Sequence, residues 1–158
     1  MEGIQLKDVE MPRLDEPEVA AWKSWLRTAK LVTGAIEHDL RQASGLTLDD
    51  FEVMVCLSEA PDQRMRLSAL GQKVANSPSR ISQRVDRLIR KGLVVRERCE
   101  EDRRGYWAIL TSEGSTVLKA ASPDHIQAVR RHFIDQMTED EVLVVASLFG
   151  RLSDQLGR

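Results

Sequence analysis

The residues with the clearest chemistry lie in the stretch from Ser77-Pro78 to Gly92. Serine is a favoured N-cap and proline a favoured first helical residue, so this stretch is predicted to be a helix. At 100° per residue, Ile81, Val85 and Leu88 fall on one face of that helix. The opposite face and its flanks carry the side chains that we expect to contact DNA: Ser77, Ser79, Arg80, Ser82, Gln83, Arg84 and Arg87.

Those residue types match the hydrogen-bonding edges of DNA bases. Arginine donates to guanine O6 and N7, glutamine pairs with adenine N6 and N7, and serine contacts base edges or phosphates. The helix N-terminus adds backbone N–H groups for a phosphate. The pattern therefore predicts a helix that lies in the major groove, although a solvated basic face on an ordinary helix has the same composition.

The charged stretch from Arg96 to Gly105, after this helix, is predicted to be the tip of a β-hairpin. Two short β-prone runs, residues 93–95 and 106–110, flank it, and Gly105 permits a sharp turn. Arg103 and Arg104 at such a tip are expected to enter the minor groove, with Asp102 holding Arg104 by a salt bridge. A solubilising charged turn is the alternative.

The charge distribution agrees with a polyanionic partner. The 158 residues have a net charge of −2, but residues 64–104 hold 12 Lys and Arg against 5 Asp and Glu, which leaves the remainder at −9. No apolar run approaches the roughly 20 residues of a spanning helix, and no apolar segment of a signal peptide follows Met1, so we expect a cytoplasmic protein without a membrane contact. No phosphate loop or catalytic constellation is present, so we predict that the chain is not an enzyme.

Amphipathic helices are also predicted before the helix that begins at Ser77-Pro78, which is called the reading helix below. Apolar residues at three- and four-residue spacing predict a helix from Glu18 to Ser44. Thr47 is expected to cap a second helix and Ser68 a short third one, which a tight turn at Ala75-Asn76 joins to the reading helix.

Two more helices are predicted after the hairpin. One begins at Thr111-Ser112, and Ser122-Pro123 is expected to interrupt it as a kink or a restart. The other follows a capping box formed by Thr138 and Glu141.

This order predicts a mainly α protein with a small β-hairpin wing. We expect a flexible N-terminal arm over residues 1–17 and a winged helix–turn–helix lobe over 46–111. Helices within 18–45 and 112–158 carry more apolar residues than the lobe can cover, so we expect them to form a homodimer.

Several motifs together resemble the MarR family of transcriptional regulators, over roughly residues 22–156. The motifs are Leu46-Thr47-Leu48, Leu67-Ser68-Ala69-Leu70, Val85-Asp86-Arg87-Leu88 followed by Lys91-Gly92-Leu93-Val94, Asp102-Arg103-Arg104, and Ala108-Ile109-Leu110-Thr111. The resemblance implies a homodimeric repressor on a palindromic operator of double-stranded DNA, released by a small aromatic or phenolic acid. It also implies that Arg104 is the wing arginine and Asp102 its partner. Pro78 and Gln83 stand where basic residues are usual in the family, so operator sequence does not carry over.

The residues that sense a ligand are less clear from the sequence. Some members of the family bind urate-like ligands with a tryptophan, an aspartate and arginines, which suggests Trp22, Trp25, Asp50 and Arg98 here. An indole N–H orients a ligand in an apolar pocket, but both tryptophans are also explained by core packing.

Two cysteines and three histidines offer weaker signals. Cys56 lies in an apolar helix and is expected to be buried, whereas Cys99 is expected in the exposed wing beside arginines that lower a thiol pKa. His125 and His132 are expected to face solvent, and we predict no metal site and no cofactor. The alternative functions are a redox-responsive regulator that uses Cys99 or Cys56 and a winged-helix module that binds a protein instead of DNA.

Overall fold

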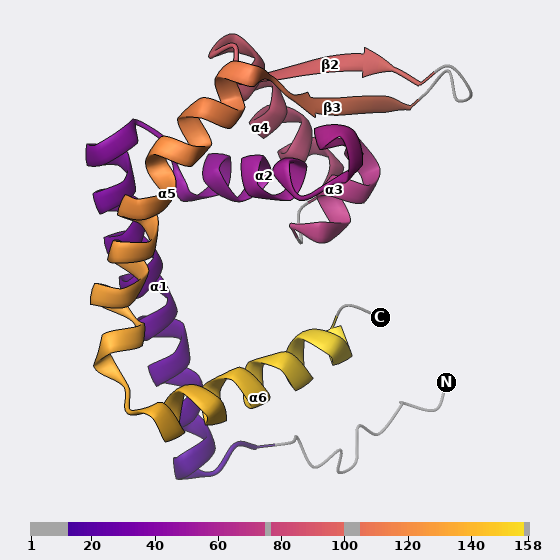
Figure 1. Cartoon of the computed structure of the whole chain (residues 1–158). Helices are drawn as coiled ribbons and strands as arrows, with labels where there is room; N and C mark the ends of the chain where they lie inside the picture. The colour runs from indigo at the N-terminus through magenta and orange to yellow at the C-terminus, as the bar shows by residue number, and fades with distance from the viewer. Residues whose placement is uncertain (1–12, 75–76, 100–104, 157–158) are drawn as a thin grey trace, which may run out of the picture.

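The computed structural model describes residues 13–74, 77–99 and 105–156, and it confirms a mainly helical chain with a small β wing. Its helices are α1 (Glu16–Ser44), α2 (Leu48–Ser58), α3 (Leu67–Lys73), α4 (Pro78–Arg90), α5 (Ser112–His132) and α6 (Glu139–Leu156) (Figure 1). Its strands are β1 (Arg64–Arg66), β2 (Val94–Arg98) and β3 (Tyr106–Leu110), and 3-10 turns η1 (Pro61–Gln63) and η2 (Ile134–Gln136) precede β1 and α6. Among the helices of these ranges, none combines the length and apolarity that a membrane span requires.

Local sequence signals set most helix ends where they were predicted. Thr47 and Ser77 are the N-caps of α2 and α4, and each accepts a hydrogen bond from a backbone N–H of the first turn. Thr138 forms the predicted capping box with Glu141, in the first turn of α6. Gly45 and Gly92 follow the ends of α1 and α4 with φ of 70° and 72°, a conformation that costs glycine little.

Three local predictions were wrong. Helix α1 begins at Glu16 rather than at 18, because Asp15 forms a capping box one turn earlier, so the end of the expected arm is helical. Residues 1–12 of that arm lie outside the described residues, as does the turn at 75–76. Ser68 lies inside α3, whose N-cap is Arg66 and has no side-chain cap. Helix α5 runs unbroken through Pro123.

The wing is larger than the predicted hairpin. Strands β2 and β3 pair antiparallel as expected, and β1 adds a third strand on the other edge of β3, with Arg64 opposite Ile109. The Arg64 guanidinium lies 4.2 Å from the centre of the Trp107 ring, which helps to hold β1 in place. Three residues are too few for an alternating pattern to predict a strand.

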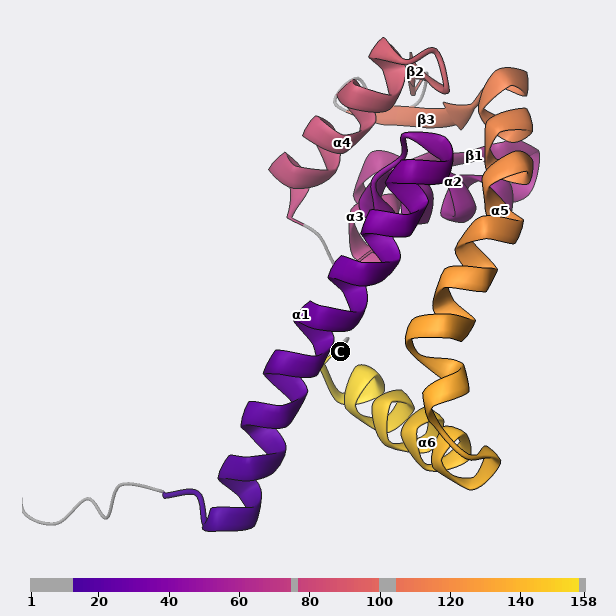
Figure 2. The ribbon, with the colours of Figure 1, turned by 90° about the vertical axis from the view of Figure 1, so that its left-hand side faces the viewer.

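The core lies within the lobe formed by α2, α3, α4 and the sheet. Leu57, Leu70, Val85, Leu88 and Ala108 are fully buried there. Helices α1 and α5 run side by side away from the lobe, and α6 departs from their far end (Figures 1 and 2). The core that α2 and α3 share also includes the apolar side of α4, so packing holds in place the helix that carries the predicted DNA contacts.

Candidate nucleic-acid interface

Helix α4 presents a polar face at the outside of the lobe. Its apolar side, with Ile81, Val85 and Leu88, is buried against the core. Figure 2 shows the helix along one flank of the lobe, with its N-terminal end pointing away from the sheet. The residues predicted to contact DNA that are exposed in this arrangement are Ser77, Ser79, Arg80 and Gln83.

These exposed residues gather at the N-terminal half of the helix. The Ser77 hydroxyl accepts the Arg80 backbone N–H at 3.4 Å and lies 3.2 Å from the Ser79 hydroxyl. The cap leaves other backbone N–H groups of the first turn open to a phosphate. Arg80 and Gln83 point their donors and acceptors outward one turn further along, where they suit base edges.

Arg87, by contrast, is held inward, which the sequence did not predict. Its Nε and one terminal nitrogen donate to Asp50 Oδ1 at 2.8 and 2.6 Å. The Asp50 side chain is completely buried, and Lys91 Nζ lies 3.6 Å from its other oxygen. This hydrogen bonding raises the pKa of Arg87 further above its ordinary value. The pair fixes the C-terminal half of α4 to α2 and engages two nitrogens of Arg87, while 38% of its side chain stays exposed.

Arg84 is also turned toward α2. Its guanidinium lies 2.6 Å from Asp49 and 3.9 Å from Glu52, and its side chain is only 14% exposed. Burial raises the pKa of Glu52 despite the arginine beside it. A helical wheel of α4 alone places Arg84 and Arg87 near the polar face, but it contains no information about the acidic residues of α2.

The wing adds cations next to α4. Arg98 lies on β2 with its Nε 3.4 Å from the Tyr106 hydroxyl, an interaction that raises the pKa of Arg98. Arg96, two residues earlier, turns toward α4 instead. The predicted tip residues Asp102, Arg103 and Arg104 lie outside the described residues.

The comparisons with known proteins agree with this architecture. The sequence profile of the MarR family matches residues 46–106. AbsC, a MarR family transcriptional regulator from Streptomyces coelicolor, is 36% identical, with 92% of this chain and 97% of AbsC covered and a TM-score of 0.84. The chain belongs to the MarR family. It is therefore a DNA-binding transcriptional regulator and not an enzyme, as the sequence predicts.

Two further MarR-like proteins are informative about function. Sco3205 from Streptomyces coelicolor, solved in complex with DNA, is 32% identical over 92% of each chain, with a TM-score of 0.87. The transcriptional repressor YetL of Bacillus subtilis is 28% identical, with 89% of this chain and 85% of YetL covered. The match to Sco3205 covers most of both chains, so this chain shares the fold of a MarR family regulator that was solved with DNA.

The four residues suggested for a ligand do not meet within one chain. Trp22 and Trp25 stack on each other, with ring centres 5.4 Å apart, on a part of α1 where their side chains are 53% and 47% exposed. Asp50 is buried in the ion pair with α4, and Arg98 lies on the wing. The sequence did not predict the ion pair of Asp50, because its arginine partner lies 37 residues away.

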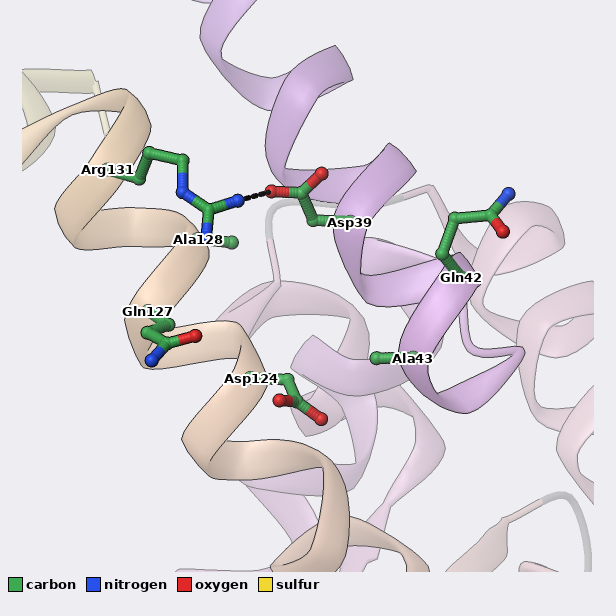
Figure 3. Close-up of a pocket in the computed structure, with 7 residues that line it drawn as sticks. All are labelled: Asp39, Gln42, Ala43, Asp124, Gln127, Ala128 and Arg131. Atoms are coloured by element: carbon green, nitrogen blue, oxygen red, sulfur yellow. Dashed lines mark hydrogen bonds and ion pairs between the residues drawn. The ribbon is translucent and has the colours of Figure 1, made fainter.

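A cleft between α1 and α5 lies elsewhere in this MarR fold. It has a volume of about 350 Å³ and is lined by Asp39, Gln42, Ala43, Asp124, Gln127, Ala128 and Arg131 (Figure 3). Asp39 faces α5, where Arg131 lies 3.2 Å and His132 2.8 Å from its Oδ2. The hydrogen bond from His132 holds the pKa of Asp39 below its ordinary value. Sequence reasoning missed this cluster because its members are 92 and 93 residues apart.

The cysteines and histidines differ from expectation in two places. Cys56 is buried as predicted, and burial raises the pKa of its thiol, which lowers its reactivity. Cys99 is also buried, at 3% exposure, so the prediction of an exposed thiol was wrong. His125 does not simply face solvent, because its ring lies 4.3 Å from that of Phe51 and burial lowers its pKa.

Proposed function

We propose that the protein is a homodimeric repressor that reads a palindromic operator with α4 and the wing. The observation that carries this proposal is the exposed group of Ser77, Ser79, Arg80 and Gln83 at the open end of α4. Ser82 lies on the flank of that group, half-buried. The similarity to a repressor and to a regulator solved with DNA supports the same assignment. Acting on DNA, the protein is expected in the cytoplasm.

The wing tip is proposed as the second point of contact. Asp102, Arg103 and Arg104 join β2 to β3, and arginine on a slender wing suits the narrow, electronegative minor groove. Asp102 is expected to orient Arg104 rather than to contact DNA itself. Contacts in both grooves give one subunit a longer footprint than α4 alone provides.

The terminal helices are proposed to form the dimer. Large apolar side chains are exposed along α6 and the outer part of α1, including Trp22, Trp25, Leu143, Phe149 and Leu152. Large apolar side chains exposed on successive turns of a helix favour an interface, and a two-fold dimer would bury them on both copies. We therefore divide the chain into an arm (1–17), dimerisation helices (18–45 and 112–158) and a DNA-binding lobe (46–111).

A small ligand is proposed to release the DNA. The resemblance to MarR regulators favours an aromatic or phenolic acid, and the stacked pair of Trp22 and Trp25 would report its arrival by fluorescence. The cleft between α1 and α5 is lined by residues of two of the proposed dimerisation helices. A titration with such acids, urate included, that changes neither tryptophan emission nor DNA binding would contradict this part of the proposal.

The central test is selection of a DNA site from a random duplex library with the full-length protein. We expect an enriched palindrome, bound by two chains, with an affinity that falls steeply as salt rises because phosphate contacts release counterions. A scrambled duplex of the same composition is the control. Enrichment of no sequence, or binding with no salt dependence, would exclude the proposed function and favour a protein-binding winged helix.

A further inference from the structure

Arg96 is the residue through which the wing contacts α4. It lies on β2, and its side chain is 25% exposed. One terminal nitrogen lies 2.9 Å from Asp86 Oδ1 and donates to the Ser82 hydroxyl at 3.3 Å. Both partners belong to α4, one turn apart, so a single guanidinium bridges the wing and the helix that carries the proposed DNA contacts.

The contact with Ser82 defines what that hydroxyl offers to DNA. A serine hydroxyl has one hydrogen and two lone pairs. Because Arg96 donates to the oxygen, the hydroxyl hydrogen is left to point elsewhere, and the nearby positive charge makes it a stronger donor. Ser82 is half-buried and lies three residues after the exposed Ser79, a spacing that puts both on one side of α4, so its hydroxyl borders the proposed DNA-contacting face. The acceptors on DNA that suit it are phosphate oxygens and the purine N7, guanine O6 or thymine O4 atoms.

The contact with Asp86 removes an electrostatic obstacle. Asp86 is a carboxylate on the flank of α4, with its side chain 46% exposed, and an isolated negative charge there would repel the phosphate backbone. The ion pair with Arg96 neutralises it at short range. Arg96 also lies 5.7 Å from the centre of the Tyr106 ring, which further restricts where its guanidinium can lie.

We propose that Arg96 is a positioning residue for DNA recognition, which orients Ser82 as a hydrogen-bond donor toward DNA and neutralises Asp86. It acts through these two residues and makes no phosphate contact of its own. This inference rests on the proposed function, because it requires that α4 reads DNA.

The test compares affinities for the selected palindrome and for a scrambled duplex at several salt concentrations. Arg96→Gln is expected to lower affinity for the palindrome about tenfold and to lower the ratio between the two duplexes. Arg96→Lys should retain most of the ratio, because an ammonium still donates to both partners. Glu97→Gln is the matched control on the same strand: Glu97 is exposed and lies on the opposite face of β2 from Arg96, so the ratio should not change.

Second-site variants separate the two routes by which Arg96 acts. Adding Asp86→Asn to Arg96→Gln should recover part of the lost affinity, because the exposed carboxylate is gone. Ser82→Ala alone should lower the ratio, and Arg96→Gln should then add little to it, since the hydroxyl that Arg96 orients is absent. Ser82→Ala changes one polar side chain of α4 and leaves Arg96 in place, so it tests the proposal even if Arg96→Gln unfolds the lobe.

Clear outcomes overturn the inference. If Arg96→Gln weakens both duplexes equally and lowers the salt slope by about one, Arg96 is a phosphate contact. If Ser82→Ala leaves the ratio unchanged, or its effect adds fully to that of Arg96→Gln, Ser82 is not the residue that Arg96 positions. If the natural protein selects no DNA at all, the proposed function fails, whereas a natural protein that selects DNA with an unaffected Arg96→Gln refutes only this inference.

Discussion

The winged lobe and the terminal helices differ in whether a single chain buries their apolar residues. In the lobe, residues such as Leu70, Val85 and Leu88 are completely buried within one chain. Helix α6 also carries large apolar side chains, yet none of its residues is buried, and Leu143 is 68% exposed. The lobe is thus complete as a single chain, whereas the terminal helices carry an unfilled apolar surface. Stability of the lobe should depend on internal contacts, and that of the terminal helices on protein concentration.

The largest expected effect comes from placing charge on the apolar side of α6. Phe149→Glu with Leu152→Glu should convert the dimer into monomer, because two carboxylates per chain would be buried without partners. Sedimentation at several concentrations measures the result. Ser147→Glu, exposed on the opposite side of the same helix, is the control and should leave the proposed dimer intact. A dimer that survives the double substitution would show that α6 is not at the interface and would break the comparison.

The next effect belongs to the lobe and should not depend on concentration. Arg87→Ala leaves the fully buried Asp50 with only Lys91 nearby, and we expect a loss of about 3 kcal/mol in the free energy of unfolding. Chemical denaturation measures it, with Arg90→Ala as an exposed control on the same helix. If Arg87→Ala folds as stably as the parent protein but binds DNA poorly, then Arg87 acts as a DNA contact rather than as a partner of Asp50.

A smaller effect distinguishes the exposed end of α4 from its anchored end. Arg80→Ala should cost about 1–3 kcal/mol of DNA-binding free energy and relax the preference at particular base pairs, because Arg80 is exposed where base edges are reached. Its unfolding free energy should change by less than about 0.5 kcal/mol. Binding titrations and denaturation curves on the same samples check both statements. Equal binding by Arg80→Ala and the parent protein would remove α4 from the DNA interface.

The smallest effect is a pH dependence at the joint between lobe and terminal helices. Burial against Phe51 lowers the pKa of His125 below its ordinary value of 6.5, so the unfolded chain takes up a proton at a higher pH than the folded one. Stability should therefore decrease as the pH falls from 6.5 through the lower folded pKa. His125→Gln should reduce that decrease in thermal melts between pH 7 and about 5. An unchanged pH profile would mean that the buried ring does not titrate in this range.

The local elements were accessible from sequence because their signals are local. Caps such as Thr47 and Ser77, the glycines that follow α1 and α4, and the apolar spacing of α4 each operate within a few residues. The same reasoning identified the exposed Arg80 and Gln83, since one face of α4 had to be buried. It failed for β1, which has three residues and is a strand only because β3 pairs with it.

What the sequence by itself determined is the order of the helices and of the β2–β3 hairpin, the polar face of α4, and membership of a DNA-binding family. Tertiary structure alone decided which polar residues are free to act. Arg84 and Arg87 share the periodicity of Arg80, yet Asp49 and Asp50 of α2 hold them, and Cys99 is buried although its neighbours are charged. The physical reason is that helical periodicity assigns a residue to a face, whereas an ion pair or burial depends on what packs against that face from distant parts of the chain.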